Sequence, residues 1–231
     1  MLLRQQGFSG NSYKLLHGDT KEMFTMTKQA ESEPTNPLSH DIAPRIIPFH
    51  HHIIMNYGKN SFIWLGPAPS INITDPKLIR EIMLRYEIFQ KPKRNPLNRL
   101  VFSGMLVYEG EQWFRVRKIA NPAFHLDKLK DMLPKMYLSC NDMVRKWKRS
   151  ISNNFHVNKI LHEALRLYPP AALFTREIVK ESKLGDIIIP PGVFISMPII
   201  LVHQDEEYWG NAMEFNPERF SQGVSKASKN D

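Results

Sequence analysis

The stretch KILHEALRLYPP, from Lys159 to Pro170, decides how the rest of this sequence is interpreted. Helical spacing of apolar residues predicts an amphipathic helix over Val157 to Tyr168 that ends before two prolines. The apolar stripe consists of Val157, Ile160, Leu161, Ala164, Leu165 and Tyr168. Glu163 and Arg166 lie about 60° apart and roughly opposite that stripe. The pattern alone favours an exposed ion pair worth about 0.3 kcal/mol, and the alternative is half of a buried ionic lock.

Composition limits the classes of protein to which this chain can belong. It has 231 residues, 42% of them hydrophobic, which fits a globular protein with one large domain or two small ones. The net charge is +8, but the basic residues form no dense block, so we expect no nucleic-acid site. A single cysteine, Cys140, leaves no disulfide within the chain. No apolar run is long enough to span a membrane, and the N-terminus lacks the apolar core of a signal peptide.

The periodic stretches predict a mainly α fold with a small β part (α+β). Four helices are expected. One covers Thr74–Tyr86, and a second lies in the stretch Glu109–Phe124 and ends before Pro122. A third runs from about Leu126 to Trp147 with a break near Pro134, and the fourth covers Val157–Tyr168. Two hairpins are expected, one with a longer loop over Asn60–Ile73 and one over Asp186–Met197 around Pro190, Pro191 and Gly192. Loops are expected over Lys28–Asp41 and Lys148–His156, and His50, His51 and His52 suggest a polar turn before a helix rather than a metal site.

A cation lies on the apolar face of the second predicted helix. On a helical wheel Arg117 shares a face with Trp113, Val116 and Ala120. A guanidinium in that position either extends to solvent, pairs with an acidic side chain or binds an anionic group. The helix alone does not decide between these alternatives.

The order of several stretches indicates a family. The helix with Glu163 and Arg166 is followed by Pro-Pro, a predicted hairpin and the stretch HQDEEYWGNAMEFNPERF from His203 to Phe220. This order resembles the cytochrome P-450 family of heme-thiolate monooxygenases, and within it the plant branch that includes secologanin synthase. GNSYKLLHGD, YGKNSFIWLG, FQKPKRNPL, EGEQWFRVRKIANPAFH and LPKMYLSCNDM are similar to that branch too. The resemblance covers nearly the whole chain.

The resemblance implies roles for six residues. Glu163 and Arg166 would form a structural lock with Arg219, a carboxylate between two guanidiniums that is costly to bury unless its hydrogen bonds are complete. Trp113 and Arg117 would bind a heme propionate, and Arg176 would bind a propionate as well. Arginine suits a carboxylate because it can donate two parallel hydrogen bonds.

Two family motifs are missing from this sequence. The heme-ligand cysteine of the family lies in a Phe-x-x-Gly-x-Arg-x-Cys-x-Gly loop, whereas Cys140 is expected to be a small buried hydrophobe. The Ala-Gly-x-Asp/Glu-Thr stretch of the family's central helix is absent between Trp147 and Glu163. We therefore expect no catalytic residue and no metal ligand here, in a partial P-450 fold lacking the central long helix and the heme-ligand loop. The expected parts are residues 1–147, a junction linker at 148–156 and residues 157–231.

The expected function follows from the resemblance. The family inserts one oxygen atom of dioxygen into a hydrophobic, here terpenoid-like, substrate with electrons from NADPH-cytochrome reductase. It works at the cytosolic face of the endoplasmic reticulum membrane; without an anchor helix, a soluble cytosolic chain is the alternative. This chain is expected to be inactive alone, with heme binding left open. The rival functions are a non-enzymatic remnant that binds the reductase or a full-length paralogue, and a peripheral membrane or phosphate binder driven by net charge.

Overall fold

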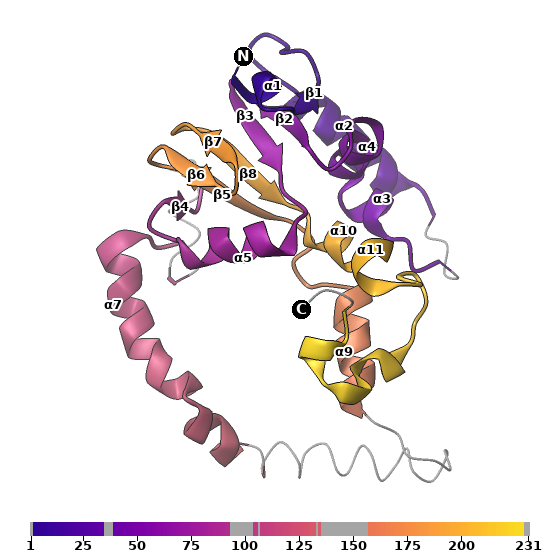
Figure 1. Ribbon diagram of the computed structural model, residues 1–231, viewed down its shortest axis with the longest axis vertical. Coiled ribbons are helices and arrows are strands. Elements are labelled where there is room, and N and C mark those ends of the chain that lie inside the picture. Colours follow the sequence, from indigo (N-terminus) through magenta and orange to yellow (C-terminus); the bar gives the residue numbers. More distant parts are fainter. Residues whose placement is uncertain are drawn as a thin grey trace. The chain divides into compact units, whose positions relative to one another are not determined.

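The computed structural model of the chain describes residues 2–34, 39–92, 104–105, 107–132, 134 and 157–228 (Figure 1). The chain divides into two compact units, residues 1–93 with 157–231 and residues 94–156. The larger unit combines helices with a small mixed sheet, and the smaller unit is helical where it is described. The predicted α+β class is therefore confirmed. The predicted linker at 148–156 lies outside the described residues.

The larger unit is built around a six-stranded sheet in the order β1-β2-β3-β8-β5-β4. Its strands are β1 (Ser9–Gly10), β2 (Ser61–Leu65), β3 (Ala68–Asn72), β4 (Phe89–Gln90), β5 (Phe174–Ile178) and β8 (Phe194–Met197). A separate antiparallel pair joins β6 (Ser182–Leu184) to β7 (Ile187–Ile189). The parallel pairing of β3 with β8, in which Ile71 is opposite Ile195, unites the two halves of the sequence in one sheet.

One predicted hairpin is confirmed and the other is wrong. Strands β2 and β3 pair in antiparallel register, although Gly66 and Pro67 alone connect them where a longer loop was expected. The strand at 187–189 pairs with β6 before it, and β8 pairs with β3 and β5. The physical reason lies in Pro190 and Pro191, which have no backbone N–H for a ladder and interrupt the apolar run.

Some helices of the larger unit pack against this sheet and others lie beyond it (Figure 1). These helices are α1 (Leu2–Gln5), α2 (Thr20–Ser32), α3 (Ala43–Ile46), α4 (Pro48–Tyr57), α5 (Pro76–Leu84), α9 (Val157–Leu167), α10 (Ile199–His203) and α11 (Glu206–Trp209), with 3-10 turns at Pro217–Gln222 and Val224–Lys226. Helix α5 begins as predicted, because the Asp75 carboxylate accepts a hydrogen bond from the Lys77 N–H at 2.8 Å. No described helix is both long enough and apolar enough to cross a membrane.

Two local expectations in the N-terminal half are corrected. Helix α2 continues to Ser32, so the loop predicted from Lys28 begins later. The three consecutive histidines lie inside α4 and not in a turn before it. Pro48 stands at the start of α4, where its missing N–H costs no hydrogen bond, and His50 is buried there.

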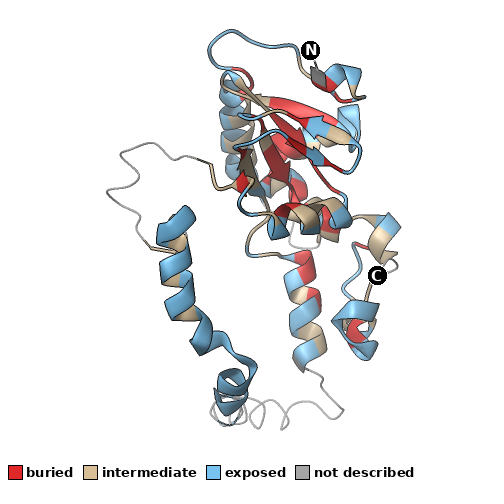
Figure 2. Ribbon diagram, turned by 60° about the vertical axis from the view of Figure 1, so that its left-hand side comes forward, coloured by how far each residue is buried: buried red, intermediate tan, exposed pale blue. Residues whose placement is uncertain are grey.

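The core lies on both faces of the sheet, as the buried strands in Figure 2 show. On one face, Phe62 and Ile71 pack with residues from α5, β5 and β8. On the other face, Ile63 packs against Phe49 and Ile53 of α4. Neighbouring residues of β2 serve opposite faces because side chains alternate along a strand. This core holds β5, which follows α9 in the chain, through Ile178 at the end of the strand.

The smaller unit contains α7 (Gly110–Ala120), a 3-10 turn at Asn121–Phe124 and helical residues 126–132. The predicted end of α7 before Pro122 is confirmed. Most of the helix predicted from Leu126 to Trp147 lies outside the described residues, as does Cys140. Within the described part, large apolar side chains are exposed: Phe114, Ile119, Phe124, Leu126, Leu129 and Met132.

Candidate functional site: a buried ionic lock on helix α9

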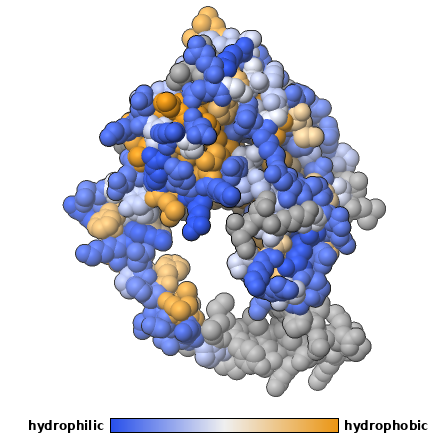
Figure 3. Space-filling view, viewed as in Figure 1, coloured by the Kyte–Doolittle hydropathy of each residue, from blue (hydrophilic) through white to orange (hydrophobic). Residues whose placement is uncertain are grey.

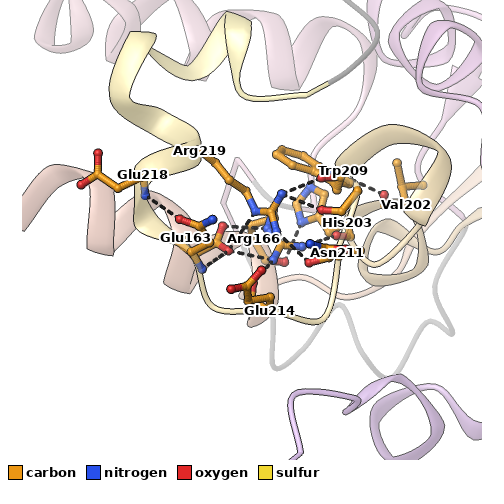
Figure 4. Close-up of polar contacts among 12 residues, drawn as sticks. Glu163, Arg166, Val202, His203, Trp209, Asn211, Glu214, Glu218 and Arg219 are labelled. Atoms are coloured by element: carbon orange, nitrogen blue, oxygen red, sulfur yellow. Dashed lines mark hydrogen bonds and ion pairs between the residues drawn. The ribbon is translucent and has the colours of Figure 1, made fainter.

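Helix α9 buries its charged face and exposes much of its apolar stripe. Glu163 is 0% exposed and Arg166 is 2% exposed, whereas Leu161, Leu165 and Tyr168 are exposed. The exposed ion pair favoured by the wheel is therefore wrong. The reason is the segment from 203 to 220, which folds over the charged face and contributes the groups that replace water there (Figure 4).

The Glu163 carboxylate is the centre of this arrangement. Arg166 donates from Nε to Oε2 at 2.7 Å and from Nη2 to Oε1 at 2.9 Å, a two-bond contact within one turn of helix. Arg219 donates from Nε to Oε1 at 3.3 Å, and the backbone N–H of Asn216 donates to the same oxygen at 2.9 Å. The structure thus brings Glu163, Arg166 and Arg219 together, and these three residues are called the ionic lock below.

Both guanidiniums also donate to backbone carbonyls. Arg166 donates to the carbonyl of His203 at 2.6 Å and to that of Glu214 at 3.3 Å. Arg219 donates to three successive carbonyls, those of Trp209, Gly210 and Asn211, at 2.6 to 2.7 Å. The bonds from Arg166 tie this segment to a helix some forty positions earlier in the chain, and those from Arg219 hold the segment itself together. The ionic lock therefore acts as a polar core for residues 203–220.

Electrostatics keep the carboxylate ionised. Burial by itself would raise the pKa of Glu163. The hydrogen bonds from Arg166 and from the Asn216 N–H, together with the charges of Arg166 and Arg219, outweigh burial and hold that pKa below its ordinary value. Two guanidiniums face this one carboxylate, and its hydrogen bonds are completed. A buried carboxylate in such surroundings can remain charged at neutral pH.

Several partners of the ionic lock were not singled out from the sequence. The Arg166 guanidinium lies over the Trp209 ring at 5.2 Å, and the Trp209 indole donates to the Val202 carbonyl at 3.1 Å. Lys159 forms an ion pair with Glu218 at 2.8 Å across the same interface. A local signal existed for one partner: Asn216 before Pro217 has the pattern of a helix start, and its side chain accepts from the Glu218 N–H.

The residues expected to hold propionates lie in different units. Trp113 and Arg117 are on α7 in the unit of residues 94–156, where Arg117 is exposed and Trp113 half-exposed. Arg176 is half-buried on β5 in the larger unit, with Nη2 3.7 Å from the Met83 sulfur. The structure describes Trp113 and Arg117 within one unit and Arg176 within the other.

These three residues fit one part of heme. An exposed guanidinium four positions after an indole on one helix presents its donors to the same side, as a carboxylate requires. Arg176 adds a second cation, in a strand next to buried β8. Each unit thus has a donor of the type that a propionate would require. Cys140, as the single cysteine of the sequence, lies outside the described residues.

Comparison with known proteins identifies the family. The family model described as Cytochrome P450 matches residues 46–161 and 156–231. The chain is 30% identical to Cytochrome P450 CYP72A219 of Panax ginseng, in an alignment that covers 98% of this chain and 80% of the relative. It is 27% identical to 11-oxo-beta-amyrin 30-oxidase of Glycyrrhiza uralensis, over 98% and 79% of the two chains. It is 37% identical to echinocystic acid 23-monooxygenase of Saponaria officinalis, over 80% and 35%.

The alignment with the Panax protein spans 413 positions, more than the 231 residues of this chain, so it contains long gaps in this chain. The two family matches meet at residues 156–161, at the start of α9. Together they account for most of the sequence, including the whole ionic lock. The chain therefore belongs to the cytochrome P450 family.

Proposed function

We propose that this chain derives from a heme-dependent plant monooxygenase, and that the complete enzyme acts on a hydrophobic, terpenoid-like substrate. Relatives named for the oxidation of 11-oxo-beta-amyrin and echinocystic acid support the reaction and this substrate class. In this proposal one oxygen atom of dioxygen enters the substrate, and NADPH-cytochrome reductase supplies electrons. The expected place is the cytosolic face of the endoplasmic reticulum membrane.

The observation that carries the proposal is the buried ionic lock. Three charged side chains with a maximum exposure of 11% form it. The Glu163 carboxylate and the carbonyls of His203 and Glu214 join residues 203–220 to α9, and Arg219 adds three hydrogen bonds to carbonyls within that segment. By its resemblance to the family, this segment leads toward the heme ligand. Its rigid attachment would fix the position at which the family's heme-ligand loop starts. This supports a positioning role for Glu163, Arg166 and Arg219.

Heme itself would supply the oxygen chemistry. In the proposal, Trp113 and Arg117 donate hydrogen bonds to one propionate and Arg176 donates to a propionate as well. Each of these two contacts would neutralise a propionate and orient the heme ring. Neither contact involves a proton transfer. The charge-assisted hydrogen bonds to guanidinium are stronger than neutral ones by roughly a factor of two.

We further propose that the 231-residue polypeptide, taken alone, does not catalyse the reaction. Its sequence contains neither the family's cysteine loop nor the acid–threonine stretch of the central helix. The long alignment gaps and the meeting of the two family matches near residue 156 support an internal loss. The acid and hydroxyl of the family's acid–threonine stretch relay protons to oxygen, so an internal loss of that stretch would remove this proton supply.

Spectroscopy of the purified 231-residue polypeptide tests both parts. We expect heme titration to show binding that weakens in Arg117→Leu but not in Arg115→Leu, an exposed arginine of the same helix that points elsewhere on the wheel. We expect the reduced protein with carbon monoxide to lack the Soret band of thiolate-ligated heme. Equal weakening by both substitutions would refute the propionate assignment, and a thiolate-type band would refute the proposed inactivity.

A further inference from the structure

Helix α9 leaves an apolar strip uncovered on the side away from the ionic lock. Leu161 is 53% exposed, Leu165 is 42% exposed and Tyr168 is 43% exposed. The three side chains lie on one face of the helix, because they are spaced by four and three residues, and they extend over about 10 Å. We call Leu161, Leu165 and Tyr168 the α9 strip.

Apolar exposure alone does not identify a docking face in this chain. Figure 3 shows apolar residues at the surface over α7 as well, and single exposed apolar side chains are common on proteins. The α9 strip differs in two respects. It is continuous over two turns of one helix, and the charged side chains of that helix are buried in its place.

The ionic lock prevents α9 from turning the strip inward. Glu163 and Arg166, which lie opposite the strip on the helical wheel, are joined to residues 203–220 by hydrogen bonds of 2.6 to 3.3 Å. A rotation of α9 that buried the leucines would break these bonds and leave buried charges uncompensated. The strip can therefore be covered only by a segment that docks onto α9 in its present orientation.

The C-terminal end of the strip is already held in place. The Tyr168 hydroxyl and His40 Nδ1 share a hydrogen bond of 2.5 Å, and the two rings lie 5.9 Å apart. The His40 ring also lies 6.3 Å from that of Phe215, which is 40% exposed, so apolar surface continues beyond the helix. A side chain that is fixed before binding loses little conformational freedom when a partner covers it.

The alignment with relatives points to one occupant of the strip. The Panax alignment has 413 positions for the 231 residues of this chain, and the two family matches meet at residues 156–161, where α9 begins. The long stretch that this chain lacks would thus end directly before α9, within a few residues of Leu161. Lys159, the lysine of α9, pairs with Glu218 at 2.8 Å, so the strip requires an apolar rather than an acidic partner.

We propose that the α9 strip docks an apolar polypeptide segment of a longer family member, namely the stretch that precedes the counterpart of α9 in relatives and that this chain lacks. In relatives the stretch is part of the same chain, whereas here a separate polypeptide would supply it. The inference rests on the internal loss proposed above. The contact needs no heme, so its outcome is distinguishable from that of the heme titration and the carbon monoxide spectrum.

Fluorescence anisotropy tests the proposal on the intact 231-residue chain. The probes are labelled, overlapping peptides of about 30 residues, each long enough for several helical turns, that together cover the stretch of the Panax protein opposite the gap. The test variant combines Leu161→Ser with Leu165→Ser. The control variant combines Met55→Ser with Leu84→Ser, which removes two side chains that are 72% and 68% exposed, on α4 and α5. Circular dichroism and thermal unfolding establish that each variant remains folded.

The proposal expects a peptide from the end of the stretch next to α9 to bind the wild type. The Kd should rise by at least about tenfold in the test variant and by less than about threefold in the control variant, because only the test variant removes leucines that the peptide covers. No binding, equal weakening in both variants, or equal binding of a scrambled peptide would overturn it. Light scattering covers the rival occupant: a dimer that the test variant abolishes, without peptide binding, would assign the strip to a second copy and overturn the proposal.

Discussion

Replacing Glu163 by glutamine tests the role of the ionic lock most sharply. The carboxylate is 0% exposed, and its partners Arg166 and Arg219 are 2% and 11% exposed at their side chains. Glutamine keeps the size of the side chain but removes the charge and turns one acceptor into a donor that faces a guanidinium. Two cations would then remain close together without a counter-charge.

The expected cost can be worked from these contacts. Removing one member of a buried ion pair typically destabilises a protein by about 3–5 kcal/mol, because the remaining charge is left uncompensated. Domains of this size are stable by roughly 5–15 kcal/mol, so the loss would be a large share of the total. With a urea slope of about 2 kcal/mol per molar, the unfolding midpoint would fall by about 1.5–2.5 M.

The assay is urea unfolding followed by tryptophan fluorescence, since Trp209 lies against Arg166, and by circular dichroism. The control is Asp186→Asn, which removes an exposed carboxylate 3.9 Å from Lys183 and should leave the midpoint unchanged. A further variant, Glu163→Leu with Arg166→Met, should not recover stability, because the carbonyls of His203 and Glu214 lose their donor. A midpoint for Glu163→Gln equal to that of Asp186→Asn would refute the reasoning.

Two further predictions concern the N-terminal half. Burial lowers the pKa of His50 from 6.5 to about 4. Between about pH 6.5 and 4 the unfolded chain therefore binds more protons than the folded one. The free energy of unfolding should fall by up to about 3 kcal/mol as pH falls through that window. The difference in urea stability between wild type and His50→Leu, followed from pH 7 to 4, should show this slope; parallel curves would contradict it. Gly18→Ala should destabilise by about 2 kcal/mol or more, because a Cβ there would lie 2.5 Å from the Gly66 carbonyl oxygen. Gly58→Ala, with φ of 84° and no atom within 4 Å of its Cβ, should cost about 1 kcal/mol. Thermal unfolding compares the two, and equal shifts would refute the clash at Gly18.

Local patterns predicted those elements whose signals lie within a few residues. The cap at Asp75 and the apolar spacing of α5 are of this kind, and so is the end of α9 before Pro169. The turn at Gly66 was found for the same reason, although its length was overestimated. Propensity and capping act over one or two turns of chain, so a single sequence is sufficient to detect them.

The burial of α9 could not be predicted from its own residues. Periodicity predicts that a helix buries its apolar stripe. In the structure, α9 instead buries the face that carries Glu163 and Arg166. That outcome depends on carbonyls at 203–214 and a guanidinium at Arg219, which periodicity does not connect with Glu163. The parallel pairing of β3 with β8 was missed for a similar reason, because strand partners far apart in sequence leave no local signal.

Hydrogen exchange at the Asn216 amide tests the central claim most directly, since this N–H donates to the Glu163 carboxylate at 2.9 Å. Exchange is followed by mass spectrometry or NMR in the wild type, in Glu163→Gln and in Asp186→Asn. If the ionic lock fixes residues 203–220, exchange at Asn216 and its neighbours should speed up by at least about tenfold in Glu163→Gln and stay unchanged in Asp186→Asn. Unaltered protection of this segment in Glu163→Gln would contradict the account.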